Sequence, residues 1–234
     1  GMTPQKAEYA QGDSPASLSD VIEGADLFLG LSGPGVLTRE MVARMADRPV
    51  VFALANPNPE ITPDDVRAVK PDAIIATGRS DFPNQVNNVL CFPFIFRGAL
   101  DVGASEINDA MQIACIEGIA ALARATTSAE AAAAYKGEQL TFGPDYLIPK
   151  PFDPRLMGVV ASAVAEAAMS SGVAKRPIDD IAAYRAKLNQ AVFRSALIMR
   201  PVFAAAATTT RRIAFAEGED ERVLRAAQAM LEET

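Results

Sequence analysis

Two neighbouring asparagines, Asn87 and Asn88, are the first candidates for chemistry in this 234-residue chain. They follow a stretch with Gly78 and Pro83 that is typical of a turn, and they precede an apolar segment. A side-chain amide carries donors and an acceptor without a charge, so it can hold a carboxylate or a keto oxygen in a partly dry pocket. Asparagine also caps helices and fills turns, and this structural role remains open for both residues.

Two further candidate sites follow apolar runs that we predict to be strands. Asn56 comes after the run 49–55, and the glycine-rich stretch 30–35, which includes Ser32 and Gly33, ends the run 26–32. Backbone amides at the carboxyl edge of a parallel sheet lie where such folds bind ligands, and glycine lets a ligand approach closely. Ordinary turn chemistry is the alternative in both places.

The composition excludes several classes of function. The chain has no histidine, so nucleophilic catalysis by Ser-His or Cys-His pairs and histidine-ligated zinc are excluded. The net charge of −7 argues against a nucleic-acid partner, and no apolar run is long enough to span a membrane. Two cysteines, Cys91 and Cys115, form no disulfide framework, which fits a reducing, cytoplasmic environment. Arg79 and Asp81 are expected to form a local ion pair.

The order of predicted elements indicates an α/β fold. Short apolar runs rich in β-branched residues alternate with predicted helices, one over 38–47 that begins at Thr38 and one that begins at Thr62; the runs are 26–32, 49–55 and 73–77. This alternation predicts a parallel sheet covered on both faces, which is one half of a doubly wound, Rossmann-like fold. Apolar periodicity then predicts helices over 106–124, about 156–171 and about 179–199, and the first of these should pack against the sheet. Capping-box spacing at 127–130 predicts the start of a further, alanine-rich helix.

The predicted elements divide the chain into three parts. We expect an incomplete dinucleotide-binding domain over 1–175, a helical linker over 176–210 and the start of another domain over 211–234. A complete dinucleotide-binding fold would include a G-x-G-x-x-G loop and an acidic residue after its second strand, and neither is found. The strand, turn and helix predicted over 211–233 are too short for a domain, so we expect the chain to be a fragment, cut at both ends.

Several unusual strings carry a family resemblance. ALANPNPEI at 53–61, ATGRSDFPNQVNNVLCFPFIFRGALD at 76–101, EIND at 106–109 and IPKPFDPR at 148–155 occur in this order. Together they resemble the nicotinamide-binding core of bacterial malic enzymes, over about residues 6–178. The segment 211–233 is similar to the opening strand and helix of phosphate acetyltransferase domains. Long hybrid malic enzymes carry such a domain after the malic part.

The resemblance implies the oxidative decarboxylation of L-malate to pyruvate and CO₂, with NAD or NADP as coenzyme and Mg²⁺ or Mn²⁺ as metal. It implies that Asn56, Ser32 and Gly33 bind the cofactor. It also implies that Asn88 binds the substrate carboxylate and that Asn87 supports the pocket. Nothing in the chain matches the family's acid–base tyrosine and lysine or its metal ligands. We therefore expect no catalytic residue in this chain and no activity of the chain alone.

Two alternatives remain at this stage. A stripe at helical spacing within 179–199 could make the chain an oligomerisation or docking module, and a homo-oligomer is expected; the stripe consists of Ile181, Tyr184, Leu188, Val192, Phe193 and Ile198. The same stripe could instead pack against its own domain. Another nicotinamide enzyme, such as an amino-acid dehydrogenase, would share the half-fold, but it would not explain the strings at 53–61 and 84–88 together.

Overall fold

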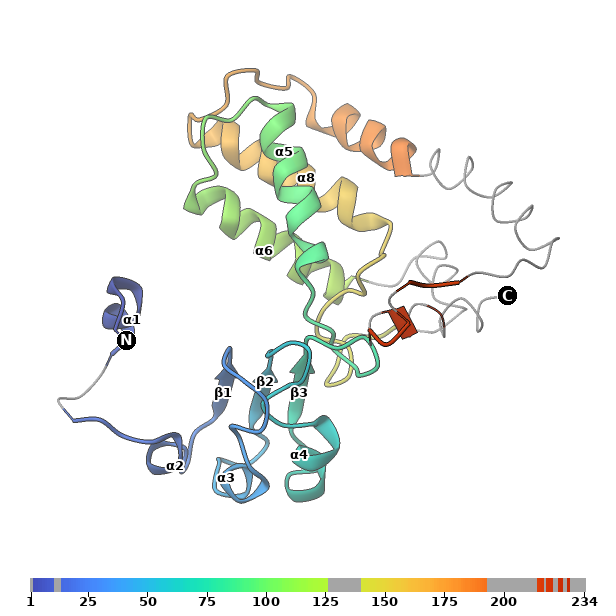
Figure 1. The fold of residues 1–234 in the computed structure, drawn as a ribbon. Helices are drawn as coiled ribbons and strands as arrows, with labels where there is room; N and C mark the ends of the chain where they lie inside the picture. Colours follow the sequence, from blue (N-terminus) through green and yellow to red (C-terminus); the bar gives the residue numbers. More distant parts are fainter. Residues whose placement is uncertain are drawn as a thin grey trace. The chain divides into compact units, whose positions relative to one another are not determined.

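The computed structural model describes residues 2–10, 14–125 and 140–192, with short stretches between 214 and 227. The chain divides into two compact units, residues 1–185 and 186–234. The first unit holds a small sheet and a group of helices (Figure 1). All of the candidate site residues belong to this unit.

Three short parallel strands form the sheet. They are paired in the order β1-β2-β3, and they span Leu27–Gly30, Val50–Ala53 and Ile74–Thr77. The register aligns their last residues, so Gly30 pairs with Ala53 and Ala53 with Thr77. The predicted strands and the α/β class are thus confirmed, and the three carboxyl ends lie at one edge of the sheet.

The helices between the strands begin where their capping residues predict. Thr38 caps α3 (Arg39–Ala43) by accepting a hydrogen bond from the N–H of Met41 at 3.3 Å. Thr62 caps α4 (Pro63–Val69) in the same way through the N–H of Asp65 at 3.2 Å. Proline at the first helical position and acidic residues in the first turn suit the start of α4. Helix α3 ends earlier than the predicted 38–47.

One face of the sheet is buried beneath these helices. Val42 of α3 and Val66 of α4 belong to the same hydrophobic cluster as Val51 of β2 and Ile75 of β3. Strand β1 instead alternates between buried and exposed residues, and Leu27 and Leu29 are 54% and 55% exposed. The prediction of cover on both faces is therefore wrong for β1 in this chain, because its second face meets solvent.

A separate helical core follows the sheet. It consists of α5 (Phe92–Asp101), α6 (Asp109–Arg124) and α8 (Arg155–Ser170). Helices α5 and α8 pack closely at Gly98, where a Cβ would lie 2.5 Å from the carbonyl oxygen of Ala161. The apolar residues of α6 pack with α8 rather than against the sheet, which corrects the prediction for this helix. An amphipathic stripe predicts that a helix is buried but does not identify its partner.

The remaining elements are short. Helices α1 (Pro4–Tyr9) and α2 (Leu18–Val21) precede the sheet, and residues 181–192 are helical. The rest of the helix predicted to residue 199, and the helix predicted from residue 127, lie outside the described residues. Within 211–234 only scattered residues are described; 214 and 215 are not in a strand, whereas 223 and 224 are helical. In the described ranges, none of the helices has the length and apolarity that a membrane crossing requires.

Candidate functional site

Three loops leave the carboxyl edge of the sheet side by side. The N–H of Leu54 donates to the carbonyl of Gly30 at 3.0 Å, so the ends of β1 and β2 stay in register. The N–H of Val86 donates to the carbonyl of Thr77 at 2.8 Å, which brings the loop after β3 back to the edge. All of the predicted site residues lie in or at the end of these loops, which follow Gly30, Ala53 and Thr77.

The loops after β1 and β2 are joined by a buried carboxylate that the sequence prediction missed. Glu60 is 0% exposed, and no lysine or arginine in the described part of the chain forms a salt bridge with it. Its Oε1 accepts hydrogen bonds from the N–H of Ser32 at 2.8 Å and from the Ser32 hydroxyl at 3.1 Å. Its Oε2 accepts from the N–H of Ala55 at 3.1 Å. The side chain of Glu60 therefore links Ser32, which precedes Gly33, to Ala55, which precedes Asn56.

The hydrogen bonds decide the charge state of Glu60. Burial alone would raise its pKa, but the N–H groups of Ser32 and Ala55 stabilise the charged form, and the net effect lowers the pKa of this carboxyl below its usual value. Desolvation of a carboxylate costs several kcal/mol, whereas hydrogen bonds to a charged group contribute roughly 1.5–3 kcal/mol each. Three such bonds explain how a charge can lie in this interior without a cation.

Two backbone features complete the environment of Glu60. A Cβ on Gly30 would lie 2.5 Å from Cδ and 2.7 Å from Oε1 of Glu60, so glycine provides the space for the carboxylate. The carbonyl of Glu60 accepts a hydrogen bond from the N–H of Leu37 at 3.3 Å. Residue 60 thus holds the loop after β1 at Ser32 through its side chain and at Leu37 through its backbone.

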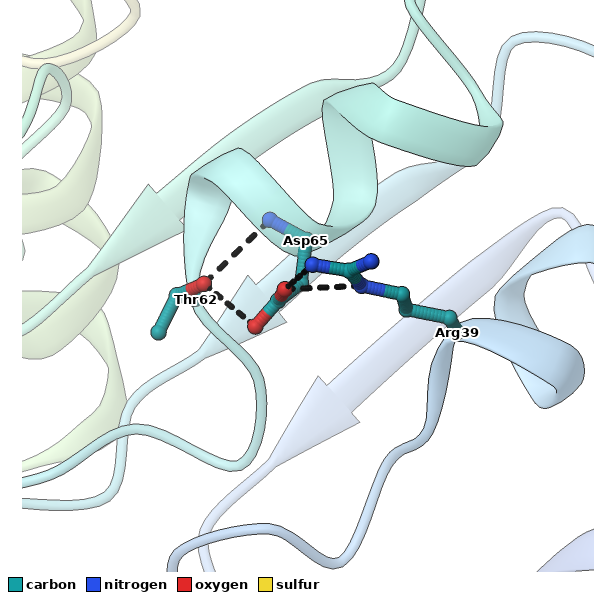
Figure 2. A network of polar contacts seen from close by, with 3 residues as sticks. All are labelled: Arg39, Thr62 and Asp65. Atoms are coloured by element: carbon teal, nitrogen blue, oxygen red, sulfur yellow. Dashed lines mark hydrogen bonds and ion pairs between the residues drawn. The ribbon is translucent and has the colours of Figure 1, made fainter.

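A second, exposed contact joins the helices that follow the same two loops (Figure 2). Arg39, the first residue of α3, donates from Nε to Asp65 Oδ1 at 2.8 Å, and its Nη2 contacts the same oxygen. The Thr62 hydroxyl donates to Asp65 Oδ2 at 2.6 Å. Both partners lower the pKa of Asp65, and the hydrogen bond from Thr62 has a larger effect than the one from Arg39. Because the pair is largely exposed, its contribution to stability is small.

The candidate cofactor residues are accessible at this edge. Asn56 is exposed, and the Asn56–Pro57 peptide bond is cis. Gly33 does not have a positive φ, and a Cβ added to it would meet no atom within 4 Å. Neither backbone conformation nor packing within the chain therefore requires glycine at residue 33. The free space beside it leaves room for a ligand to approach the backbone.

The asparagines after β3 have different roles. Asn87 accepts a hydrogen bond from the N–H of Val89 at 3.0 Å and caps the short 3₁₀ helix η1 (Asn88–Leu90), as the structural alternative predicted. Asn88 is exposed, and no hydrogen bond to its amide is found among the described residues. The structure thus joins Ser32 and the Asn56 turn through Glu60, whereas none of the hydrogen bonds of the described residues links them to Asn88.

The asparagine that organises the loop after β3 is Asn84. It is 6% exposed and has a φ of 56°. Its amide donates to the carbonyls of Ile75 at 2.8 Å and Pro144 at 2.6 Å, and its oxygen accepts from the N–H of Leu147 at 2.7 Å. Neighbouring Arg79 and Asp81 form the expected ion pair through bonds of 2.8 and 2.7 Å.

Comparison with protein families identifies the chain. Residues 2–135 match the family model described as "Malic enzyme, NAD binding domain", which is more than half of the sequence. The chain belongs to the malic enzyme family. The matched range contains the whole sheet and every candidate residue at its carboxyl edge.

Individual malic enzymes agree with this assignment. The chain is 62% identical to an NAD-dependent malic enzyme of Rhizobium meliloti over 99% of its own length, and it spans 30% of that protein. It is 56% identical to an NADP-dependent malic enzyme of Halomonas elongata over 74% of its length, and it spans 41% of that protein. The crystal structure of Entamoeba histolytica malic enzyme superposes with a TM-score of 0.68 at 34% identity, over 85% of the chain and 39% of that structure. The chain thus spans well under half the length of these relatives.

The residues at the sheet edge fit part of what a malic enzyme needs. An exposed amide at Asn56 and free space at Gly33 suit a nicotinamide coenzyme, which binds where parallel strands end. A divalent metal does not fit in the same way. The described residues contain no group of three acidic or cysteine side chains that could hold such an ion.

Proposed function

We propose that this chain is part of an NAD(P)-dependent malic enzyme, which converts L-malate to pyruvate and CO₂ by oxidative decarboxylation. The family match over residues 2–135 carries the proposal. The two relatives described above differ in coenzyme, one being NAD-dependent and the other NADP-dependent, so the proposal includes both coenzymes. The nicotinamide would accept the hydride that leaves malate.

The residues at the sheet edge provide binding and orientation. We assign the coenzyme to Asn56, Ser32 and Gly33, where an amide, a hydroxyl and open backbone lie near two adjoining strand ends. We assign a malate carboxylate to Asn88, whose exposed amide donates no hydrogen bond to any other described residue. Asn87 supports this site because it holds the start of η1 through the N–H of Val89. None of these side chains exchanges protons near neutral pH, so their part is to position the reactants.

The chain alone is proposed to be inactive. Acid–base residues and the ligands for Mg²⁺ or Mn²⁺ would come from the remainder of a longer protein, since the relatives are much longer than this chain. The test is an absorbance assay for malate-dependent formation of reduced coenzyme, performed on this chain and on the full-length protein. Activity only in the full-length protein is expected. Turnover by the chain alone would refute the assignment of the chemistry to other segments.

We further propose that the longer protein is of the hybrid class. The Rhizobium alignment covers 233 residues yet only 30% of that protein, whereas the Halomonas alignment covers 172 residues and 41% of a shorter one. This difference supports a further segment after the malic part in the longer relative. We propose a malic part over 1–175, a linker over 176–210 and an acetyltransferase-like start over 211–234. A full-length gene sequence that continues into an acetyltransferase domain is the expected result, and a stop soon after residue 234 would contradict it.

Assembly is also part of the proposal. We propose a homo-oligomer in the cytoplasm, with Cys91 and Cys115 as free thiols. The alternative in which the stripe within 179–199 serves only to dock a partner is less well supported. Tyr184 of this stripe donates its hydroxyl to Asp101 of α5 at 2.7 Å, so this residue is used within its own unit. Light scattering of the chain with and without residues 176–234 tests the docking role, since an unchanged oligomeric state would exclude it.

A further inference from the structure

Three donors on two separate loops meet the buried carboxylate of Glu60. Ser32 contributes its N–H and hydroxyl to Oε1, and Ala55 contributes its N–H to Oε2. Each oxygen therefore holds one loop, and the carboxylate sets the distance between them. These loops carry the half-buried Gly33, which has free space beside it, and the exposed Asn56.

The requirements of this arrangement are strict. A carboxylate can accept hydrogen bonds at both oxygens, whereas an amide of the same size has one accepting oxygen and one N–H₂ group that only donates. A glutamine at residue 60 would turn an N–H₂ group toward a backbone N–H on one of the loops. The required space is equally specific, because a Cβ on Gly30 would overlap the Glu60 carboxylate. Gly30 at the end of β1 thus leaves the space in which the carboxylate of Glu60, from the loop after β2, binds both loops.

We infer that Glu60 is a positioning residue for the coenzyme: its carboxylate holds the Ser32–Gly33 turn and the Ala55–Asn56 turn in the spacing that binds the nicotinamide side of NAD(P). This inference rests on the proposed function. Glu60 lies beneath the turns and is fully buried, so it acts through them rather than through contact with the coenzyme. The loops are held in place before binding, which lowers the entropy cost of ordering them around a ligand.

The inference predicts a specific kinetic signature. In the full-length protein, Glu60→Gln should raise the KM and the Kd for coenzyme by about tenfold, the effect of losing one hydrogen bond to a charged group. The KM for malate should change by less than about twofold, because Asn88 follows a different strand. Kd for the reduced coenzyme is measured by fluorescence titration without malate, so this measurement does not depend on turnover.

A second variant disturbs the same contact from the other side. Gly30→Ala keeps the Glu60 side chain, but the added Cβ would lie 2.5 Å from Glu60 Cδ and 2.7 Å from Phe28 Cε1. The carboxylate must then shift together with the Phe28 ring, so this variant should also weaken coenzyme binding. The variant with both substitutions should have about the same coenzyme Kd as the single variant with the higher Kd. Both substitutions disturb the same contact, between the Glu60 carboxylate and the two loops, so their effects should not add. If Glu60→Gln does not fold, Gly30→Ala still tests the inference.

Asp153 provides the matched control. It is another buried carboxylate of the same unit, and it pairs with Arg155 at 2.6 Å instead of joining the strand-end loops. Asp153→Asn should lower thermal stability but leave coenzyme Kd unchanged. Loss of stability without any change in coenzyme Kd or KM for Glu60→Gln and Gly30→Ala would overturn the inference, since Glu60 would then be structural only. Failure of the unaltered full-length protein to oxidise malate, with coenzyme binding intact, would instead count against the proposed function.

Discussion

The side chain of Asn84 accepts a hydrogen bond from the N–H of Leu147, 63 residues further along the chain, at 2.7 Å. Its amide also donates to the carbonyls of Ile75 in β3 and Pro144. One buried residue thus ties the loop after β3 to the segment that leads into α8. This loop ends at Asn87 and Asn88, so the anchor also supports the proposed malate site.

Asn84→Ala is expected to destabilise the first unit by on the order of 3 kcal/mol, because two carbonyls and one N–H lose their partner in the interior. The φ of 56° adds to the cost, since alanine disfavours this region by roughly 1 kcal/mol. Asn84→Gly separates the loss of hydrogen bonds from the backbone strain. It removes the side-chain amide, but glycine adopts a positive φ without strain, so it should destabilise the unit less than alanine does. Urea unfolding of the wild type, Asn84→Ala and Asn84→Gly measures the hydrogen-bond contribution and the backbone contribution to the free energy of unfolding. Equal stabilities for wild type and Asn84→Gly would show that these hydrogen bonds contribute nothing.

Asn87 and Asn88 should respond differently to alanine. Asn87→Ala removes the cap of η1 and should cost about 1 kcal/mol of stability. Asn88→Ala should change stability by less than about 0.5 kcal/mol, because its amide is exposed. In the full-length protein, Asn88→Ala should raise the KM for malate by about tenfold through a lost bond to a carboxylate. An unchanged KM would remove Asn88 from the proposed substrate site.

Local sequence signals predicted the fold around the sheet well. The apolar runs gave the three strands, and Thr38 and Thr62 gave the starts of α3 and α4, because strands and caps depend on neighbouring residues. The packing of α6 was predicted incorrectly. Its apolar stripe shows that one face is buried, but the partner, α8, depends on the tertiary arrangement.

The site was only partly predictable for a related reason. Its location at the strand ends followed from the parallel order, which fixes where loops emerge. Glu60 gave no signal, since glutamate is almost always exposed and its three donors come from residues 32 and 55. Asn84, Asn87 and Asn88 look alike in sequence. Only the donors and acceptors around each amide distinguish an anchor, a cap and an accessible group.

The charge of Glu60 should make stability depend on pH in a defined direction. Its pKa in the folded state is lower than the usual 4.5, so its contribution is complete above pH 4.5 and is lost as the pH falls below 4.5 through the folded-state value. In Glu60→Gln, the side chain at residue 60 has no carboxyl group to titrate. The difference in unfolding free energy between wild type and Glu60→Gln should therefore be largest near neutral pH and decrease in acid. Urea titrations across this range measure it, and a constant difference would mean that folding leaves the Glu60 pKa unchanged.

Gly33 offers a direct test of the coenzyme site. A side chain here would meet open space within the chain, so Gly33→Val should leave thermal stability nearly unchanged. If the coenzyme approaches the backbone at this turn, the added methyl groups should weaken its binding about tenfold or more, the size of a typical overpacking penalty. The Kd for reduced coenzyme in the full-length protein is the measurement.

Gly143→Val is the matched control for this substitution. Gly143 also lacks a positive φ, and a Cβ there would make only an ordinary contact at 3.9 Å, but the residue lies outside the three strand-end loops. It should leave coenzyme Kd unchanged. If both valine variants bind coenzyme like the wild type, the turn after β1 does not contact the coenzyme. The cofactor role of Ser32 and Gly33 would then be wrong, whereas that of Asn56 on the neighbouring strand would remain to be judged by its own alanine variant.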